Sequence, residues 1–154
     1  MDFVFQNQAT DKKFGEDFFK KILETASSEL KLVNKNISVS LNLVGEGKIK
    51  ELNKKHRNKD KVTDVLSFPM TEKVLKNLKP KIYNLKPVDL GDIFICLSFA
   101  KKEAKSENIY IERKLAQLTV HGFLHLAGYD HEVSKQEAEK MFDLENEILK
   151  KLKL

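Results

Sequence analysis

Residues 37–43, with the sequence ISVSLNL, alternate strictly between apolar and polar side chains. Successive side chains of a β-strand point to opposite faces, so this pattern predicts a strand that buries one of its faces. Residues 2–6 and 63–70 are also strand-like. Residues 92–97, DIFICL, form a nearly continuous apolar run, which is typical of a strand buried on both faces. The chain must therefore build a sheet that other elements cover.

Helical patterns separate these strand-like segments. Apolar side chains recur at intervals of three and four residues, as along the buried side of a helix, in residues 14–33, 48–56, 109–128 and 134–152. A shorter stripe follows Ser98, which we expect to cap a fifth helix. Ser134 and Glu137 have the spacing of a capping box, and Gly128 is expected to end the preceding helix in a left-handed conformation.

Four strands interleaved with about five helices predict an α+β fold. We expect a single domain over residues 1–154, with a mixed sheet of about four strands covered by the helices. Pro69 is expected to end the third strand or to place it at an edge of the sheet. Residues 71–90 contain two prolines and several lysines without a clear period, so we expect a long loop there.

Composition narrows the class of protein. No apolar stretch approaches the roughly 20 residues that cross a bilayer, and the first residues lack the basic start and apolar run of a secretory signal. A single cysteine, Cys96, excludes an internal disulfide. We therefore expect a cytoplasmic protein outside the membrane. The net charge of +5 and the pI near 9.1 favour a polyanionic partner.

Three of the four histidines lie in the segment HGFLHLAGYDH. His121 and His125 are four residues apart, so on a helix their imidazoles lie on one face, one turn from each other. The turn expected at Gly128 lets His131 reach the same point. Three imidazoles with an open position are a catalytic zinc ligand set, because structural zinc sites normally add a fourth protein ligand. We therefore predict one Zn²⁺ per chain, or another divalent transition metal, at the end of a buried helix.

Three further residues, Cys96, Gly122 and Asp130, each have more than one interpretation. Cys96 is the only thiol that could close the metal site, although a cysteine in an apolar strand is more often a core residue. Asp130 could bind the metal, orient an imidazole or form a turn. Gly122 could allow the close approach of a neighbouring strand or of a large substrate.

The spacing of the histidines around Gly128 is similar to the zinc motif of the metzincin peptidases. Those enzymes need a glutamate directly after the first histidine, where it is the general base for the zinc-bound water. Gly122 occupies that place here and has no side chain. A zinc peptidase-like hydrolase that takes its base from elsewhere in the fold is therefore an alternative to the leading hypothesis.

The segments HGFLHLAGYDHE, TDVLSFP and GDIFI together resemble the YbeY endoribonuclease family of bacterial rRNA maturation factors. The resemblance spans most of the chain, from Ile49 to Glu145. It implies a zinc-type ion on His121, His125 and His131 and metal-dependent cleavage of single-stranded RNA. It further implies roles in maturation of the small-subunit rRNA 3′ end and in ribosome quality control. The expected partners are single-stranded RNA, rRNA and the ribosome or its small subunit, while the oligomeric state is left open.

Arg57 is the expected catalytic residue. Only two of the 28 basic residues are arginines, and a planar guanidinium in a lysine-rich chain favours a site that needs a bidentate donor. The family resemblance also places an arginine in this basic segment, residues 54–61, which we expect to be a loop. We expect Arg57 to bind the phosphate and Lys59 to help bind the substrate. A diffuse positive field, or merely a solvated surface, is expected from Lys54, Lys55 and Lys61.

Several points stay open at the level of the sequence. The nucleophile could be a metal-bound hydroxide or the ribose 2′-hydroxyl, and the ends of the products would distinguish them. The general acid could be Asp130, Glu132 or His56. A noncatalytic ribosome-associated RNA-binding module, in which the metal only supports the fold, is the remaining alternative.

Overall fold

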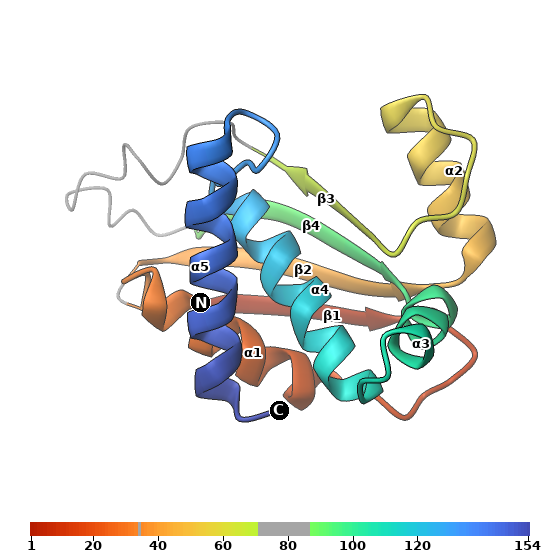
Figure 1. The fold of residues 1–154 in the computed structure, drawn as a ribbon, viewed down its shortest axis with the longest axis horizontal. Coiled ribbons are helices and arrows are strands. Elements are labelled where there is room, and N and C mark those ends of the chain that lie inside the picture. Colours follow the sequence, from red (N-terminus) through yellow and green to blue (C-terminus); the bar gives the residue numbers. More distant parts are fainter. Residues whose placement is uncertain (34, 71–86) are drawn as a thin grey trace.

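The computed structural model describes residues 1–33, 35–70 and 87–154 and is shown in Figure 1. The described residues form four strands and five helices, in the order β1 (Asp2–Asn7), α1 (Glu16–Glu29), β2 (Ile37–Val44), α2 (Glu46–Arg57), β3 (Val65–Pro69), β4 (Val88–Cys96), α3 (Leu97–Ser106), α4 (Ile111–Leu126) and α5 (Lys135–Leu152). The predicted α+β fold is therefore confirmed. None of the helices in these ranges combines the length and apolar character needed to cross a bilayer.

The strands form one mixed sheet in the order β1-β2-β4-β3. β1, β2 and β4 run parallel, whereas β3 runs antiparallel to β4 and lies at one edge (Figure 1). Pro69 is the last residue of β3 and faces Gly91 of β4. A proline has no amide hydrogen, so the end of an edge strand is a place where it costs little. The expected position of Pro69 is confirmed.

One face of the sheet carries the main core. The alternate residues of β2 that were expected to point inward are almost fully buried: Ile37, Val39, Leu41 and Leu43. Helices α1, α4 and α5 cover this face, and α4 packs against α1, α3 and α5 as well as β3 and β4 (Figure 1). α4 is therefore held on several sides, which makes it a rigid support for the side chains at its end.

Helix α2 packs against the other face of the sheet, at one end. Ile49 of α2 joins Val44, Leu66 and Cys96 in a second buried cluster. The residues next to Leu66 and Cys96 in their strands, Val65 and Ile95, belong to the main core. Because side chains alternate between the faces of a strand, the two clusters lie on opposite sides of the sheet.

The expected start of the fourth strand at Asp92, directly after Gly91, is wrong, because β4 begins at Val88. The register between β2 and β4 shifts between Ser38 and Ser40, and Gly91 lies in this irregular part with a φ of +121°. Glycine adopts this positive φ without strain, so the strand continues through the bulge to its start at Val88. Of the loop expected at 71–90, residues 71–86 lie outside the described residues.

Two expected helix boundaries are also wrong. Helix α2 continues through Arg57 and ends at Asn58, whose φ is +56°, so the first half of the basic segment is helical. Ser98 lies inside α3, which begins at Leu97 directly after β4. Its hydroxyl donates to Oε1 of Glu46 at 3.3 Å instead of capping the helix. In contrast, Ser134 caps α5 as expected by accepting the amide hydrogen of Glu137.

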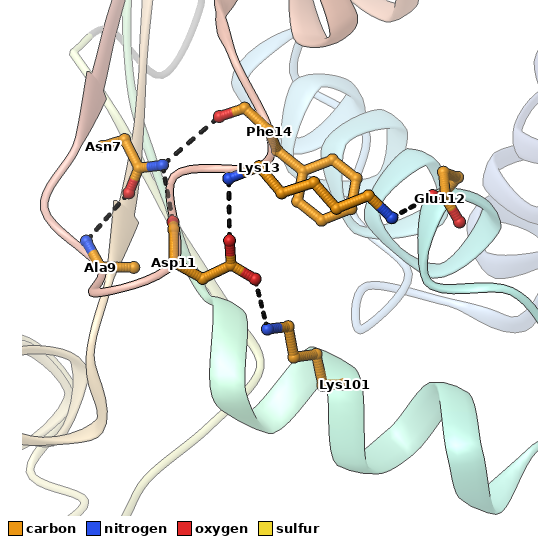
Figure 2. Close-up of polar contacts among 7 residues, drawn as sticks. All are labelled: Asn7, Ala9, Asp11, Lys13, Phe14, Lys101 and Glu112. Atoms are coloured by element: carbon orange, nitrogen blue, oxygen red, sulfur yellow. Dashed lines mark hydrogen bonds and ion pairs between the residues drawn. The ribbon is translucent and has the colours of Figure 1, made fainter.

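Polar contacts fix the loop between β1 and α1 (Figure 2). The side-chain amide of Asn7 donates to the carbonyl of Asp11 at 3.0 Å. The carboxylate of Asp11 pairs with Lys101 of α3 at 2.6 Å, and this hydrogen bond lowers the pKa of Asp11. Lys13 pairs with Glu112 of α4 at 3.0 Å. One short loop is thus connected to the two helices that follow β4.

Gly122 lies where α4 crosses β4. A Cβ atom at this position would lie 2.9 Å from Cγ2 of Ile93, closer than packed side chains approach. The glycine therefore allows α4 to pack closely on the sheet. Of the two interpretations left open by the sequence, the close approach of a neighbouring strand is the one observed.

We expect Gly122→Ala to lower the free energy of unfolding by about 1–3 kcal/mol, because an added methyl group forces a packed core apart. Gly47→Ala is the matched control, since Gly47 also lies in a helix but no atom lies within 4 Å of the place that its Cβ would take. This control should keep or raise the stability, by up to about 1 kcal/mol. Urea unfolding measures both, and a Gly122→Ala variant as stable as the parent would contradict the packing argument.

Candidate functional site

Three histidine side chains meet at the C-terminal end of α4. His121 and His125 lie on the last turns of the helix, and Gly128 follows with a φ of +93°. This turn brings His131 to the other two, so that the ring centroids are 4.6, 5.0 and 5.2 Å apart. One ligand atom from each ring lies within 4.8 Å of the others. The predicted cluster is formed, and it could hold a metal ion.

The geometry of the donors fits a divalent transition metal. Nε2 of His125 lies 3.1 Å from Nε2 of His121. Two nitrogens on a tetrahedral ion with bonds of about 2.1 Å are roughly 3.4 Å apart, so this pair needs little adjustment. Imidazole nitrogen is a ligand that suits zinc, copper, iron and nickel. The donor set is therefore compatible with the predicted Zn²⁺ and with its alternatives.

Glu145 of α5 orients one of these rings. Its Oε1 lies 2.6 Å from Nδ1 of His121. A carboxylate in this position accepts the hydrogen on Nδ1 and leaves the lone pair on Nε2, the atom that faces His125. The contact thus selects the tautomer of His121 that can bind a metal together with its neighbours.

The second imidazole is held in its neutral form. The pKa of His125 is lowered to about 4, chiefly by burial and also by the nearby rings of His121 and His131, against the opposing effect of Asp130. A metal ion competes with protons for imidazole nitrogen. Because His125 is neutral at pH 7, its lone pair is available without the loss of a proton.

Glu145 is a site residue that the sequence analysis did not identify. The inward stripe of α5 contains Met141, Ile148 and Leu152, and all three are buried. Glu145 follows Met141 by four residues and so falls on the same stripe. A carboxylate among buried apolar positions requires a partner. The place of Glu145 on this stripe is therefore the sequence signal that could have identified it.

A cavity of about 590 Å³ lies beside the histidines. Its walls come from α4, α5, the edge strand β3 and the segment that precedes β3. Arg57, the last residue of α2, lines this cavity together with His121, His125 and His131. The structure therefore brings the predicted arginine and the predicted metal ligands to one site from distant parts of the chain.

Buried Asn53 holds the turn that follows Arg57. Its Nδ2 donates to the carbonyl of Lys61 at 2.9 Å, and its own backbone carbonyl accepts from the amide of Lys59 at 3.2 Å. Asn53 is 1% exposed, so these contacts form inside the fold. They fix the path of the chain between the end of α2 and β3, and with it the position of Arg57.

The lysines on either side of Arg57 in the sequence are not among the described residues that line the cavity. Lys59 is exposed and is not among the described residues that line the cavity. Lys54 lies 3.5 Å from a carboxylate oxygen of Asp60, which also faces Lys50 at 3.9 Å. The carboxylate of Asp60 therefore balances part of the positive charge expected from this segment. Arg57, in contrast, lines the cavity.

The other candidates occupy different positions. Asp130 lines the cavity, and its Oδ1 accepts the amide hydrogen of Glu132 at 2.9 Å, so it forms a turn. Glu132 lines the cavity as well. His56 is exposed on α2 with its ring centroid 4.8 Å from that of Phe68. Cys96 is fully buried in the second cluster, as its interpretation as a core residue predicts.

Comparison with known proteins relates the chain to one family. The family model described as Endoribonuclease YbeY matches residues 4–153. The chain is 39% identical over 147 residues to the Endoribonuclease YbeY of Persephonella marina, with 96% of this chain and 87% of that protein covered. It is 40% identical over 154 residues to that of Limosilactobacillus reuteri, with 97% and 96% covered. The solution structure of TM1509 from Thermotoga maritima has a TM-score of 0.63 and 28% identity, covering 96% of this chain and 86% of that chain.

Proposed function

The chain belongs to the YbeY endoribonuclease family, and from this premise we propose that it cleaves single-stranded RNA in a metal-dependent reaction. We propose further that residues 1–154 act as one catalytic domain in maturation of the small-subunit rRNA 3′ end and in ribosome quality control. The observation that carries the proposal is a single cavity lined by Arg57 and by three clustered histidines. The partners would be rRNA and the ribosome or its small subunit, in the cytoplasm.

The two alternative functions are not favoured. The relatives are named as endoribonucleases, which gives no support to a peptidase. Gly122, at the place of a peptidase's general base, packs against Ile93. The same names give no support to a noncatalytic RNA-binding module.

His121, His125 and His131 would hold the metal, which we propose to be Zn²⁺ with one ion per chain. When bound, such an ion supplies a Lewis acid next to the substrate phosphate and lowers the pKa of coordinated water. Glu145 keeps His121 in the tautomer that presents Nε2, and burial keeps His125 neutral. The protein's own contribution at this point is a preorganised set of three nitrogen donors, of which His125 is held neutral by burial.

Arg57 would bind the phosphate that is cleaved. Negative charge grows on the nonbridging phosphate oxygens during attack, and a planar guanidinium can donate two parallel hydrogen bonds to them. Lys59 lies on the surface near Arg57 and would attract the RNA backbone beyond the cavity. Asp130 and Glu132 line the cavity, so either is better placed than His56 to protonate the leaving oxygen.

Cleavage of a defined single-stranded RNA, a matched duplex and an unstructured protein tests the proposed function. We expect the purified chain to cleave only the single strand and to lose this activity when a chelator removes the metal. Products that end in a 2′,3′-cyclic phosphate would indicate attack by the ribose 2′-hydroxyl. Chelator-sensitive digestion of the protein substrate would support a peptidase instead.

We expect Glu145→Ala to weaken Zn²⁺ binding by about 10- to 100-fold, because the ring of His121 loses the carboxylate that orients it. Glu147→Ala removes an exposed carboxylate of the same helix and serves as the control. Competition with a chelator of known affinity measures both dissociation constants. Equal affinities of Glu145→Ala and the parent would show that the contact has no role in metal binding.

A further inference from the structure

The cavity extends beyond Arg57 and the histidines into a part that the proposed chemistry does not use. This part lies between α4 and α5, which are packed side by side (Figure 1). Leu118 and Leu149 are buried there, at 6% and 8% exposure. The more accessible side chains in this part are those of Gln117, Phe142 and Asn146.

Phe142 is unusually exposed for an aromatic residue of an amphipathic helix. It is 62% exposed, whereas Met141 beside it is 1% exposed and belongs to the core. Phe142 therefore contributes little to the packing of α5, although it lines the cavity. An accessible aromatic ring at the rim of a cavity offers a flat face on which an unpaired base can stack.

Gln117 and Asn146 supply the polar groups of this part of the cavity. Both side chains are half-buried, and neither amide has a hydrogen-bond partner within the described part of the chain. A side-chain amide carries a donor and an acceptor together, so it can pair with the edge of a nucleobase. The chemistry of these two residues thus complements the edge of a base, as that of Phe142 complements its face.

These three residues lie next to the candidate metal ligands. Gln117 precedes His121 by four residues on α4, and Asn146 directly follows Glu145, which contacts His121 at 2.6 Å. Phe142 and Asn146 are four residues apart and share one face of α5. Gln117 is therefore about one helical turn from His121 along α4, and Phe142 and Asn146 lie within one turn of Glu145 along α5.

We propose that Gln117, Phe142 and Asn146 form a binding subsite for one unpaired nucleobase of the RNA substrate. The base stacks on Phe142, and the two amides form hydrogen bonds with its edge. This inference rests on the proposed function and adds to it the feature of the substrate that is recognised. In a duplex, the faces of a base are stacked and its Watson–Crick edge is paired, so the subsite favours single strands.

Short 2′-O-methyl RNA oligomers test the subsite without being cut through their 2′-hydroxyls. Each oligomer carries the fluorescent base 2-aminopurine at a different position, and stacking on an aromatic ring quenches its emission. We expect the parent to quench one position, and Phe142→Ala to lose this quenching and to bind about ten-fold more weakly. Phe142→Trp should restore both signals, because tryptophan also stacks.

Tyr110→Ala is the matched control, since Tyr110 is 83% exposed at the start of α4 and is not among the described residues lining the cavity. This variant should behave as the parent. Asn146→Ala and Gln117→Ala should change the preference among the four bases at the quenched position by several-fold, because they remove contacts to the base edge. Thermal unfolding of every variant verifies that the fold is kept.

The outcomes separate this inference from the proposed function. A Phe142→Ala variant that binds and quenches as the parent does overturns the subsite, even if the parent cleaves RNA. Loss of quenching that tryptophan restores supports it. A parent that binds and quenches the oligomers but never cleaves single-stranded RNA overturns the proposed endonuclease reaction and leaves the base-binding subsite supported.

Discussion

We expect His125→Ala to lose Zn²⁺ from the histidine group during purification and to cleave single-stranded RNA about 10³-fold more slowly than the parent. Nε2 of His125 lies 3.1 Å from Nε2 of His121, so its loss leaves only two imidazoles. Two imidazoles hold a divalent ion more weakly than three, so the proposed reaction would lose the charge that the ion supplies. Elemental analysis and single-turnover cleavage on the same preparation measure the two losses together.

His56→Ala is the control for this variant. His56 is the fourth histidine of the chain, exposed on α2 and outside the three-histidine group. The His56→Ala variant should keep both the metal and the cleavage activity. If purified His125→Ala cleaved RNA as fast as the parent, the cleavage would come from another site or from a contaminating nuclease, and the proposed centre would be wrong.

We expect Arg57→Ala to keep one metal ion per chain, while its cleavage rate falls by about 10²- to 10³-fold. The guanidinium is not part of the candidate ligand group, so metal binding does not depend on it. It lines the same cavity and is expected to act on the phosphate as charge develops. Arg57→Lys should recover only part of the rate, because a lysine supplies a charge without the planar pair of donors.

Arg113→Ala is the matched control for the arginine variant. Arg113 is the other arginine of the chain, and its Nη1 donates to the carbonyl of Leu154 at 2.6 Å. Its removal changes the net charge by the same amount and should leave cleavage unchanged. If Arg57→Ala lost metal in proportion to activity, Arg57 would support the metal site instead of acting on the phosphate.

Local patterns predicted those parts of the fold that depend on local geometry. The alternation of β2 predicted its buried face, because the side-chain period of a strand is two residues. The four-residue interval between His121 and His125 and the turn at Gly128 predicted the histidine cluster for a similar reason. The start of β4 was predicted wrongly, because the bulge at Gly91 interrupts the period that defines a strand.

The remaining parts of the site depend on how distant elements pack. Arg57 was identified because arginine is rare in this chain. Its place in the cavity, however, follows from the packing of α2 and β3. The contact between Glu145 and His121 exists because α5 lies against α4, and the sequence shows only a carboxylate on an inward stripe. The part of the cavity that contains Phe142 has the same origin.

Titration of metal-free protein with Zn²⁺, followed by cleavage of a single-stranded RNA, tests the central claim most directly. We predict that the cleavage rate rises in proportion to added metal and stops rising at one ion per chain. The same titration of His125→Ala should give no activity at any point. Full cleavage by the metal-free protein would contradict the account.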